Sequence, residues 1–205
     1  MRKLAAWGTA IVTIVVLAVP LLESGGLGSS SSASALANTG GGACPAPISG
    51  EPTDVVPGTS SDLGVGGTTH DDLVDFAIRF NEIRVEHCLQ PIPFENFSWN
   101  SCMEQRLFWM AEDPSTDRKS AWGHLGSKRS DGVPSVGCDA NIAGGLDNTG
   151  ATVATKWWDS PKHRASLYRP DSDIAGACIA FAMTHGGVPD ESPSFTRAAA
   201  RWYNC

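Results

Sequence analysis

The sequence contains few basic residues. It has 15 Lys and Arg against 22 Asp and Glu, which gives a formal net charge of -7 at pH 7. An acidic protein repels nucleic-acid phosphates and anionic lipid headgroups, and the basic residues present form no stripe along the chain. We therefore expect no nucleic-acid partner.

Closely spaced cysteines are also missing. The two nearest, Cys88 and Cys102, lie in separate segments, so no Cys-x-x-Cys metal site is present. All of the cysteines follow residue 37: Cys44, Cys88, Cys102, Cys138, Cys178 and Cys205. An even number in an exported chain favours disulfides. We expect Cys88 to pair with Cys102 and Cys138 with Cys178, and Cys44 to tie the preceding segment to the domain.

Long apolar runs are absent beyond the N-terminus. One such run covers residues 4–22, after Arg2 and Lys3 and before a Gly/Ser stretch that ends in Ala37. This layout predicts a signal peptide over residues 1–37 and a secreted, extracellular protein. The alternative is an uncleaved anchor, which would be the protein's only contact with the membrane. Both interpretations place the remaining chain outside the cytoplasm.

The rest of the chain divides into a leader and a domain. Residues 38–67 are rich in Gly, Ser, Pro and Thr and lack a periodic apolar pattern, which predicts a flexible leader. Residues 68–205 have a common size for a single domain with one core.

The first half of this domain has helical patterns. Thr69 is placed to cap a helix that runs to about His87. Ser101 and Glu104 have the spacing of a capping box for a second helix, which Pro114 closes. A third helix is expected over residues 151–159, and Ser160 before Pro161 predicts the start of a fourth.

Strands are expected later in the chain. Residues 174–183 are apolar at successive positions, as in a central strand that is covered on both faces, and residues 195–203 are similar. A loop over residues 185–194 would join the two strands, and a short strand is expected over residues 140–143. Helices followed by strands predict an α+β domain.

Four segments carry a family resemblance: Asn81–Arg84, Trp122–His124, Asp139–Gly144 and Trp157–Arg164. In this order, followed by the strand that begins near Ile174, they resemble the bacterial branch of the CAP superfamily, named after cysteine-rich secretory proteins, antigen 5 and pathogenesis-related proteins. The resemblance covers residues 73–203. It implies a three-layer α-β-α sandwich with a twisted antiparallel sheet.

The resemblance also implies a cleft that is lined by two histidines and, in many members, two glutamates. The histidines correspond to His124 and His163, whereas the glutamate positions carry Ala140 and Ser160. Asp139 or Asp159 could partly substitute for the glutamates. Neighbouring residues on a strand face opposite sides, however, so we expect Asp139 to point away from the side of the cleft that Ala140 faces. Activities that depend on all four residues are therefore in doubt.

Two interpretations of the histidines remain open. His124 and His163 could bind zinc weakly, with water or Asp139 completing the coordination shell. We favour the alternative, in which each is a hydrogen-bonded histidine of the cleft. Trp122, two residues before His124, is a candidate for an apolar wall of the cleft.

A hydrolase would use His163 as the base for Ser160 or for a metal-bound water. A serine directly before a proline has a simpler role as a helix cap, and the sequence has no Gly-x-Ser-x-Gly motif. We therefore predict no catalytic residues. The favoured function is a secreted binding module for a lipid or cell-envelope ligand. The alternative is a weak metal-dependent hydrolase or protease centred on His124 and His163, and a wall-associated structural protein also fits.

Overall fold

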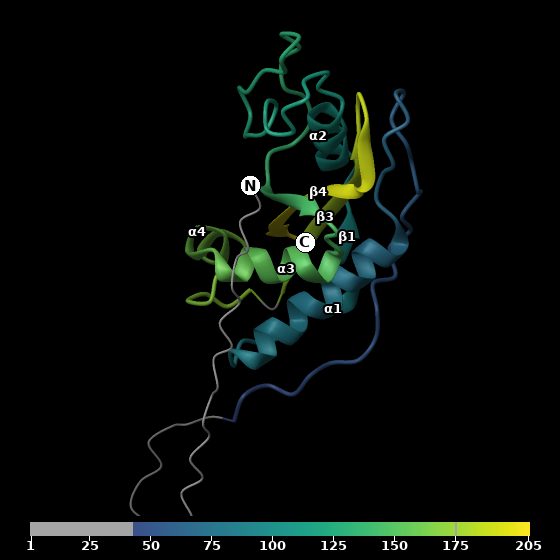
Figure 1. The fold of residues 1–205 in the computed structure, drawn as a ribbon. Helices are drawn as coiled ribbons and strands as arrows, with labels where there is room; N and C mark the ends of the chain where they lie inside the picture. The colour runs from purple at the N-terminus through teal and green to yellow at the C-terminus, as the bar shows by residue number, and fades with distance from the viewer. Residues whose placement is uncertain (1–42, 175) are drawn as a thin grey trace, which may run out of the picture. The chain divides into compact units, whose positions relative to one another are not determined.

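The computed structural model describes residues 43–174 and 176–205 (Figure 1), so the predicted signal peptide lies outside the described residues. The described residues belong to one compact unit, residues 42–205. Its elements in chain order are α1 (His70–Glu86), the 3-10 helix η1 (Phe94–Asn96), β1 (Phe97–Trp99), α2 (Ser101–Ala111), β2 (Asn141–Leu146), α3 (Gly150–Asp159), α4 (Pro161–His163), the π-helix η2 (Arg164–Tyr168), β3 (Ala177–Gly187) and β4 (Glu191–Asn204). The predicted α+β class is confirmed.

Helix α1 begins where the sequence predicts. The Thr69 hydroxyl accepts a hydrogen bond from the N–H of Asp72, and the Asp72 carboxylate accepts one from the N–H of Thr69. This reciprocal pair satisfies two N–H groups that the first helical turn leaves without intrahelical partners. The apolar face buries Leu73, Phe76 and Phe80, all of them fully inaccessible to solvent.

The sheet is mixed, which corrects the expectation of a wholly antiparallel one. Its strand order is β1-β3-β4-β2. Strands β3 and β4 form a long antiparallel pair, and β2 is antiparallel to β4. Strand β1 is parallel to β3, with Phe97 opposite Ile179. Strand β3 begins three residues later than predicted, and both long strands extend into the predicted loop, which is reduced to residues 188–190. Strand β2 begins one residue later than predicted.

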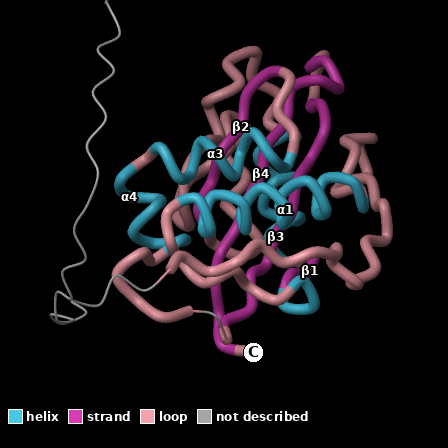
Figure 2. Tube along the Cα trace, turned by 90° about the horizontal axis from the view of Figure 1, so that it is seen from below, coloured by secondary structure: helices cyan, strands magenta, loops and turns pink. Residues whose placement is uncertain are grey.

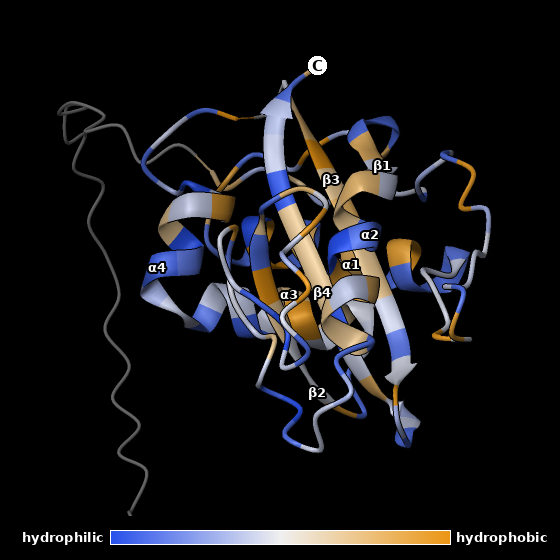
Figure 3. Ribbon diagram, turned by 90° about the horizontal axis from the view of Figure 1, so that it is seen from above, coloured by the Kyte–Doolittle hydropathy of each residue, from blue (hydrophilic) through white to orange (hydrophobic). Residues whose placement is uncertain are grey.

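Successive residues of β3 belong to different hydrophobic clusters. Ile179 and Phe181 pack in the first cluster, which also contains residues of α1 and α3. Ala180 and Ala182 pack in the second, with residues of α2. Alternating side chains point to opposite faces of a strand, so the sheet is covered on both faces, as the sequence predicts. Figure 2 shows α1 and α3 across one face, and Figure 3 shows α2 across β3 and β4 from the other.

Helix α2 begins with a different cap from the predicted one. Asn100 is the N-cap, and its side chain accepts a hydrogen bond from the N–H of Met103. The expected partner, Glu104, is instead 3% exposed, and its Oε1 accepts hydrogen bonds from the N–H and the hydroxyl of Thr68, both at 2.7 Å. Its Oε2 accepts from the Thr59 hydroxyl at 2.5 Å. Glu104 therefore anchors the segment before α1.

The disulfides differ from the expected pairs. Their pairing is Cys44–Cys88, Cys102–Cys138 and Cys178–Cys205. Both predicted pairs are wrong because sequence proximity does not determine which cysteines meet in space. The expectation that Cys44 ties its segment to the domain is confirmed. Three disulfides are typical of proteins that fold in an oxidising compartment.

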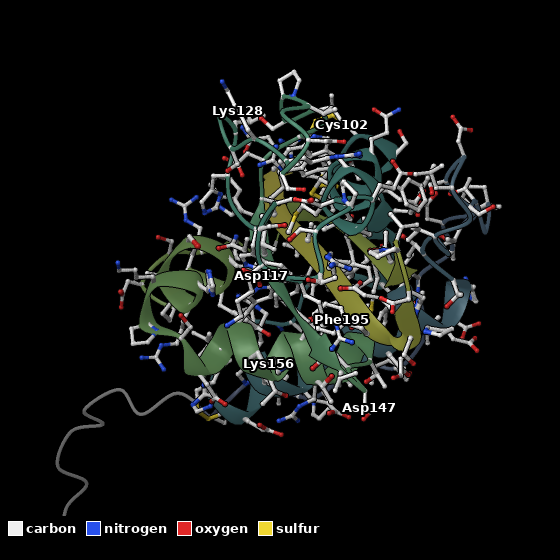
Figure 4. The ribbon with its side chains drawn as sticks, turned by 45° about the horizontal axis from the view of Figure 1, so that its top comes forward. Cys102, Asp117, Lys128, Asp147, Lys156 and Phe195 are labelled. Atoms are coloured by element: carbon white, nitrogen blue, oxygen red, sulfur yellow. A yellow bond between two sulfur atoms is a disulfide. The ribbon has the colours of Figure 1, made fainter. Side chains whose placement is uncertain are left out.

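A long irregular loop, residues 112–140, joins α2 to β2. The Asp113 carboxylate organises it by accepting hydrogen bonds from the Ser115 N–H at 3.0 Å, the Ser120 hydroxyl at 2.5 Å and the Ser130 hydroxyl. Burial acts to raise the pKa of Asp113, but the hydrogen bonds outweigh it and lower the pKa to about 2. In Figure 4, Lys128 of this loop lies at the same end of the molecule as Cys102 of α2.

Among residues 43–174 and 176–205, none of the helices combines the length and the apolar character that a membrane crossing requires.

Candidate functional site

Both predicted histidines line one open surface hollow, which we call the histidine hollow. Its volume is about 500 Å³. It lies where the end of the irregular loop and the start of β2 face α4 and η2. Its lining residues are His124, Asp139, Ala140, Asn141, Lys162, His163 and Ser166.

The Asp139 carboxylate orients His124. The distance between His124 Nδ1 and Asp139 Oδ1 is 2.6 Å. An ionised carboxylate only accepts hydrogen bonds, so Nδ1 carries the proton and Nε2 is left as the acceptor in the neutral ring. Partial burial acts to raise the pKa of Asp139, but the hydrogen bond and charge of His124 outweigh it and the pKa is lowered.

The position of Asp139 corrects the expectation that it points away. Strand β2 begins at Asn141, so Asp139 lies in the preceding loop, where strand alternation does not apply. Asp139 and Ala140 consequently both line the hollow.

His163 ends the short helix α4 and lines the same hollow. Burial lowers its pKa, and repulsion from the His124 ring, when that ring is protonated, lowers it further. The His163 ring is therefore neutral at pH 7, which is the state that coordinates metals or exchanges hydrogen bonds with a polar ligand. Beside it, the Ser166 hydroxyl lies 2.5 Å from Asn141 Oδ1, which joins η2 to β2. The same hydroxyl lies 3.2 Å from the His163 carbonyl oxygen of α4.

Arg106 of α2 supports the loop that carries His124, a role that was not predicted from the sequence. The residue is fully buried, and its Nη2 donates to the Gly123 carbonyl oxygen at 2.6 Å. Its guanidinium also lies 4.7 Å from the centre of the Trp109 ring. The available signal was its helical spacing: Arg106 falls three residues after Met103 and four before Met110, on the buried face of the helix.

The Cys102–Cys138 disulfide holds the other half of the same site. Cys138 directly precedes Asp139, and the Cys138 N–H also donates to the Cys102 carbonyl oxygen at 2.9 Å. Gly137 has φ +75°, and a Cβ there would lie 2.4 Å from the Cys102 carbonyl oxygen. Only glycine allows this approach of the loop to α2.

The other two residues predicted for the cleft lie outside the lining of the hollow. Trp122 is half-buried beside the second hydrophobic cluster, and a Cβ on Gly144 would lie 2.6 Å from its ring. Ser160 occupies the N-cap position of α4, as predicted, but its side chain makes no capping hydrogen bond. The capping explanation for this hydroxyl is therefore wrong.

The donors of the hollow fit a weak metal site at most. Within the described part of the chain, no three His, Cys, Asp or Glu side chains are grouped closely enough to hold a metal ion. His124 and His163 supply two imidazoles, whereas a structural zinc site has four protein ligands and catalytic sites have three. Asp139 has the role of an outer-shell partner, because its carboxylate accepts the second N–H of a potential ligand ring.

No family model, curated protein or solved structure matches this chain. The chemistry of the histidine hollow is therefore the basis for assigning a function.

Proposed function

We propose that this chain is an extracellular binding module of the CAP superfamily, with that family's three-layer α-β-α sandwich, and that the histidine hollow is its ligand site. The ligand is a small molecule or a cell-envelope component with a polar group that reaches both imidazoles. The sequence motifs support the family, and the coverage of both sheet faces is compatible with the sandwich.

One observation carries the proposal: Asp139 orients the exposed ring of His124 in the same hollow as His163. An oriented ring loses little conformational freedom when a ligand binds, so more of the interaction energy remains as affinity. Lys162 adds a positive charge to the lining, and Ser166 adds a hydroxyl group. These groups favour a ligand with an acidic or strongly hydrogen-bonding end.

The charge of Asp139, the one carboxylate that lines the hollow, favours binding over hydrolysis. A carboxyl group that acts as a general acid needs a pKa that is raised toward the working pH. The pKa of Asp139 is lowered, and its carboxylate is engaged with His124. Ala140 supplies no acid or base, and Ser160 does not line the hollow.

A second candidate function is weak binding of a divalent metal such as zinc. The observation that favours it is the Asp139–His124 hydrogen bond, since metal-binding histidines usually donate their other N–H to such a partner. His124 Nε2 and His163 would hold the ion, and water would fill the remaining positions. A bound ion of this kind would supply Lewis acidity, which is the basis of the alternative hydrolase or protease function.

Native mass spectrometry of the secreted protein tests the proposal. We expect a mass excess under native conditions that is lost on denaturation, and its size distinguishes a metal ion from an organic ligand. His124→Ala and His163→Ala should each abolish the excess. His70→Ala is the matched control, because His70 is exposed at the start of α1, outside the hollow.

Retention of the bound mass in both hollow variants would refute the proposed site. Hydrolysis of peptide or ester substrates that is abolished by His163→Ala and retained in His70→Ala would instead support the hydrolase. In either case circular dichroism must show that the variants keep the wild-type fold.

A further inference from the structure

A second hollow region lies between α1 and the segment before it. We call residues 44–54 the strap. Its ends are fixed by the Cys44–Cys88 disulfide and by Asp54, whose Oδ2 accepts a hydrogen bond from the Trp99 N–H at 2.7 Å. Two hollows of about 470 and 410 Å³ lie along the strap and share Ile48, Gly50 and Phe94 as lining residues. We call these two adjoining hollows together the strap groove.

The walls of the strap groove are apolar. Ile48 on the strap is 40% exposed, and Ile78 on α1 is 37% exposed. Phe94, which is 8% exposed, lines both hollows. Ile78 departs from the pattern of α1, because the outer face of a surface helix is normally polar. Exposed apolar side chains that gather in one hollow make this surface a candidate for binding.

The rim of the groove is acidic. Glu82 and Glu86 line the first hollow, and Glu51 and Glu95 line the second. Among the described residues that line the two hollows, none is Lys, Arg or His. Arg79, outside the lining, contacts Glu82 at 3.0 Å and Glu86 at 2.9 Å. One cation therefore offsets part of the charge of four carboxylates, and the groove remains negative.

The strap is held in a fixed path, so the groove exists before a ligand arrives. Besides the two fixed ends, Pro47 and Pro52 restrict its backbone. Gly50 has φ +129°, and a Cβ there would lie 3.3 Å from the Phe94 ring, so glycine allows the strap to approach this ring closely. A preformed groove reduces the entropy that binding would otherwise cost.

We propose that the strap groove binds an extended basic peptide segment of a partner protein. In such a segment, apolar side chains contact Ile48, Ile78 and Phe94, and lysine or arginine side chains pair with the glutamates of the rim. Charge complementarity of this kind selects the partner and accelerates the encounter. An anionic lipid is disfavoured, because its headgroup would meet four carboxylates. The groove shares no lining residue with the histidine hollow, so this inference is independent of the proposed function.

A labelled peptide provides the test. The probe is a fluorescein-labelled hexapeptide of alternating lysine and leucine, and its matched control alternates glutamate and leucine. In fluorescence polarisation at low salt, we expect the basic peptide alone to bind the disulfide-intact protein. Chemical shift changes in the amide spectrum should centre on Ile48, Gly50 and Glu82. Raising the salt from 0.05 to 0.5 M should weaken binding, because it screens exposed charges.

Two groove variants, each with a control variant outside the groove, test the charged and the apolar contacts separately. Glu51→Lys with Glu95→Lys reverses two exposed charges outside the Arg79 contacts, and we expect about tenfold weaker binding, since an exposed ion pair contributes roughly 0.2–1 kcal/mol. Ile48→Ser removes an apolar contact and should also weaken binding of the labelled basic peptide. The matched controls are Asp171→Lys with Asp190→Lys, and Leu146→Ser. These exposed residues lie outside the groove lining, so their substitution should leave binding unchanged.

Three results would overturn the proposal. The first is equal binding of the basic and acidic peptides. The second is binding that the groove variants and the control variants weaken to the same extent. The third is that dodecanoate, a fatty acid, shifts the same amide signals while the basic peptide does not bind. This result would identify an apolar lipid groove.

Discussion

Two aspartate–histidine pairs in this protein have the same chemistry and different surroundings. Asp72 Oδ2 and His185 Nε2 are 2.8 Å apart, and these side chains are 10% and 27% exposed. Asp139 Oδ1 and His124 Nδ1 are 2.6 Å apart, and these side chains are 39% and 67% exposed. The first pair joins the start of α1 to β3, whereas the second lies on the irregular loop beside the histidine hollow.

The surroundings determine what each pair does. Asp72 also accepts hydrogen bonds from the N–H and the hydroxyl of Thr69, so it links the cap of α1 to the sheet. Its hydrogen bond raises the pKa of His185 against the opposing effect of burial. An exposed ion pair contributes little to stability because water competes for both partners. We infer that Asp72–His185 stabilises the fold and that Asp139–His124 leaves a ring nitrogen available for a ligand.

The largest expected effect comes from removing the support of the exposed pair. The double variant Cys102→Ala with Cys138→Ala removes a disulfide between cysteines with a sequence separation of 36. The unfolded chain then gains conformational freedom, so the free energy of unfolding should fall by about 4 kcal/mol. Asp139 loses its covalently fixed neighbour, so the His124–Asp139 hydrogen bond should weaken. Denaturant unfolding and the ring ¹⁵N shifts of His124 measure these two effects.

A second disulfide provides the matched control for this variant. Cys178 and Cys205, with a sequence separation of 27, join the start of β3 to the C-terminus. Removing them should reduce stability by a similar amount, about 3.5 kcal/mol, and leave the ring shifts of His124 unchanged. Equal changes of the His124 shifts in both variants would mean that the Cys102–Cys138 disulfide does not specifically support the pair.

A smaller effect separates the two pairs directly. Asp72→Asn removes a charged acceptor from both a helix cap and the His185 ring, and we expect a loss of about 2 kcal/mol in the free energy of unfolding. Asp139→Asn should cost less than about 1 kcal/mol, because that pair is exposed. Urea unfolding of both variants at pH 6 makes the comparison. Equal losses would contradict the difference in role that we assign to the pairs.

Local patterns in the sequence predict the parts of the fold that local interactions determine. Helix α1 and its Thr69 cap follow from apolar spacing and from a hydrogen bond within one turn. The cap of α2 was misplaced by one residue, because Asn100 and Ser101 are both good caps and Glu104 has the spacing of a capping box. Only the fold reveals that Glu104 is buried against Thr59 and Thr68.

Long-range contacts account for what the sequence does not predict. His124 and His163 became candidates through the family resemblance, since nothing in their local patterns links them. The Cys102–Cys138 pairing and the buried Arg106 depend on how the irregular loop returns to α2. The prediction that Asp139 points away applies strand alternation to a residue that lies two positions before β2 begins.

The smallest expected effect is a difference in how His185 and His163 couple stability to pH. The pKa of His185 is raised, mainly by its hydrogen bond to Asp72, so the native state binds more protons than the unfolded state. Its contribution is complete below the unfolded value of 6.5 and is lost as pH rises through the folded pKa. The pKa of His163 is lowered, mainly by burial, so its contribution is complete above 6.5 and is lost as pH falls through the folded pKa.

The two histidines should therefore give stability slopes of opposite sign. His185→Gln removes a term that falls with pH, so the slope of unfolding free energy between pH 5.5 and 8 should become more positive than in the wild type. His163→Gln removes a term that rises with pH, so the slope should become more negative. Urea unfolding at steps across this range measures both. A shift of the same sign in the two variants would show that the surroundings of these rings do not differ in the way their contacts indicate.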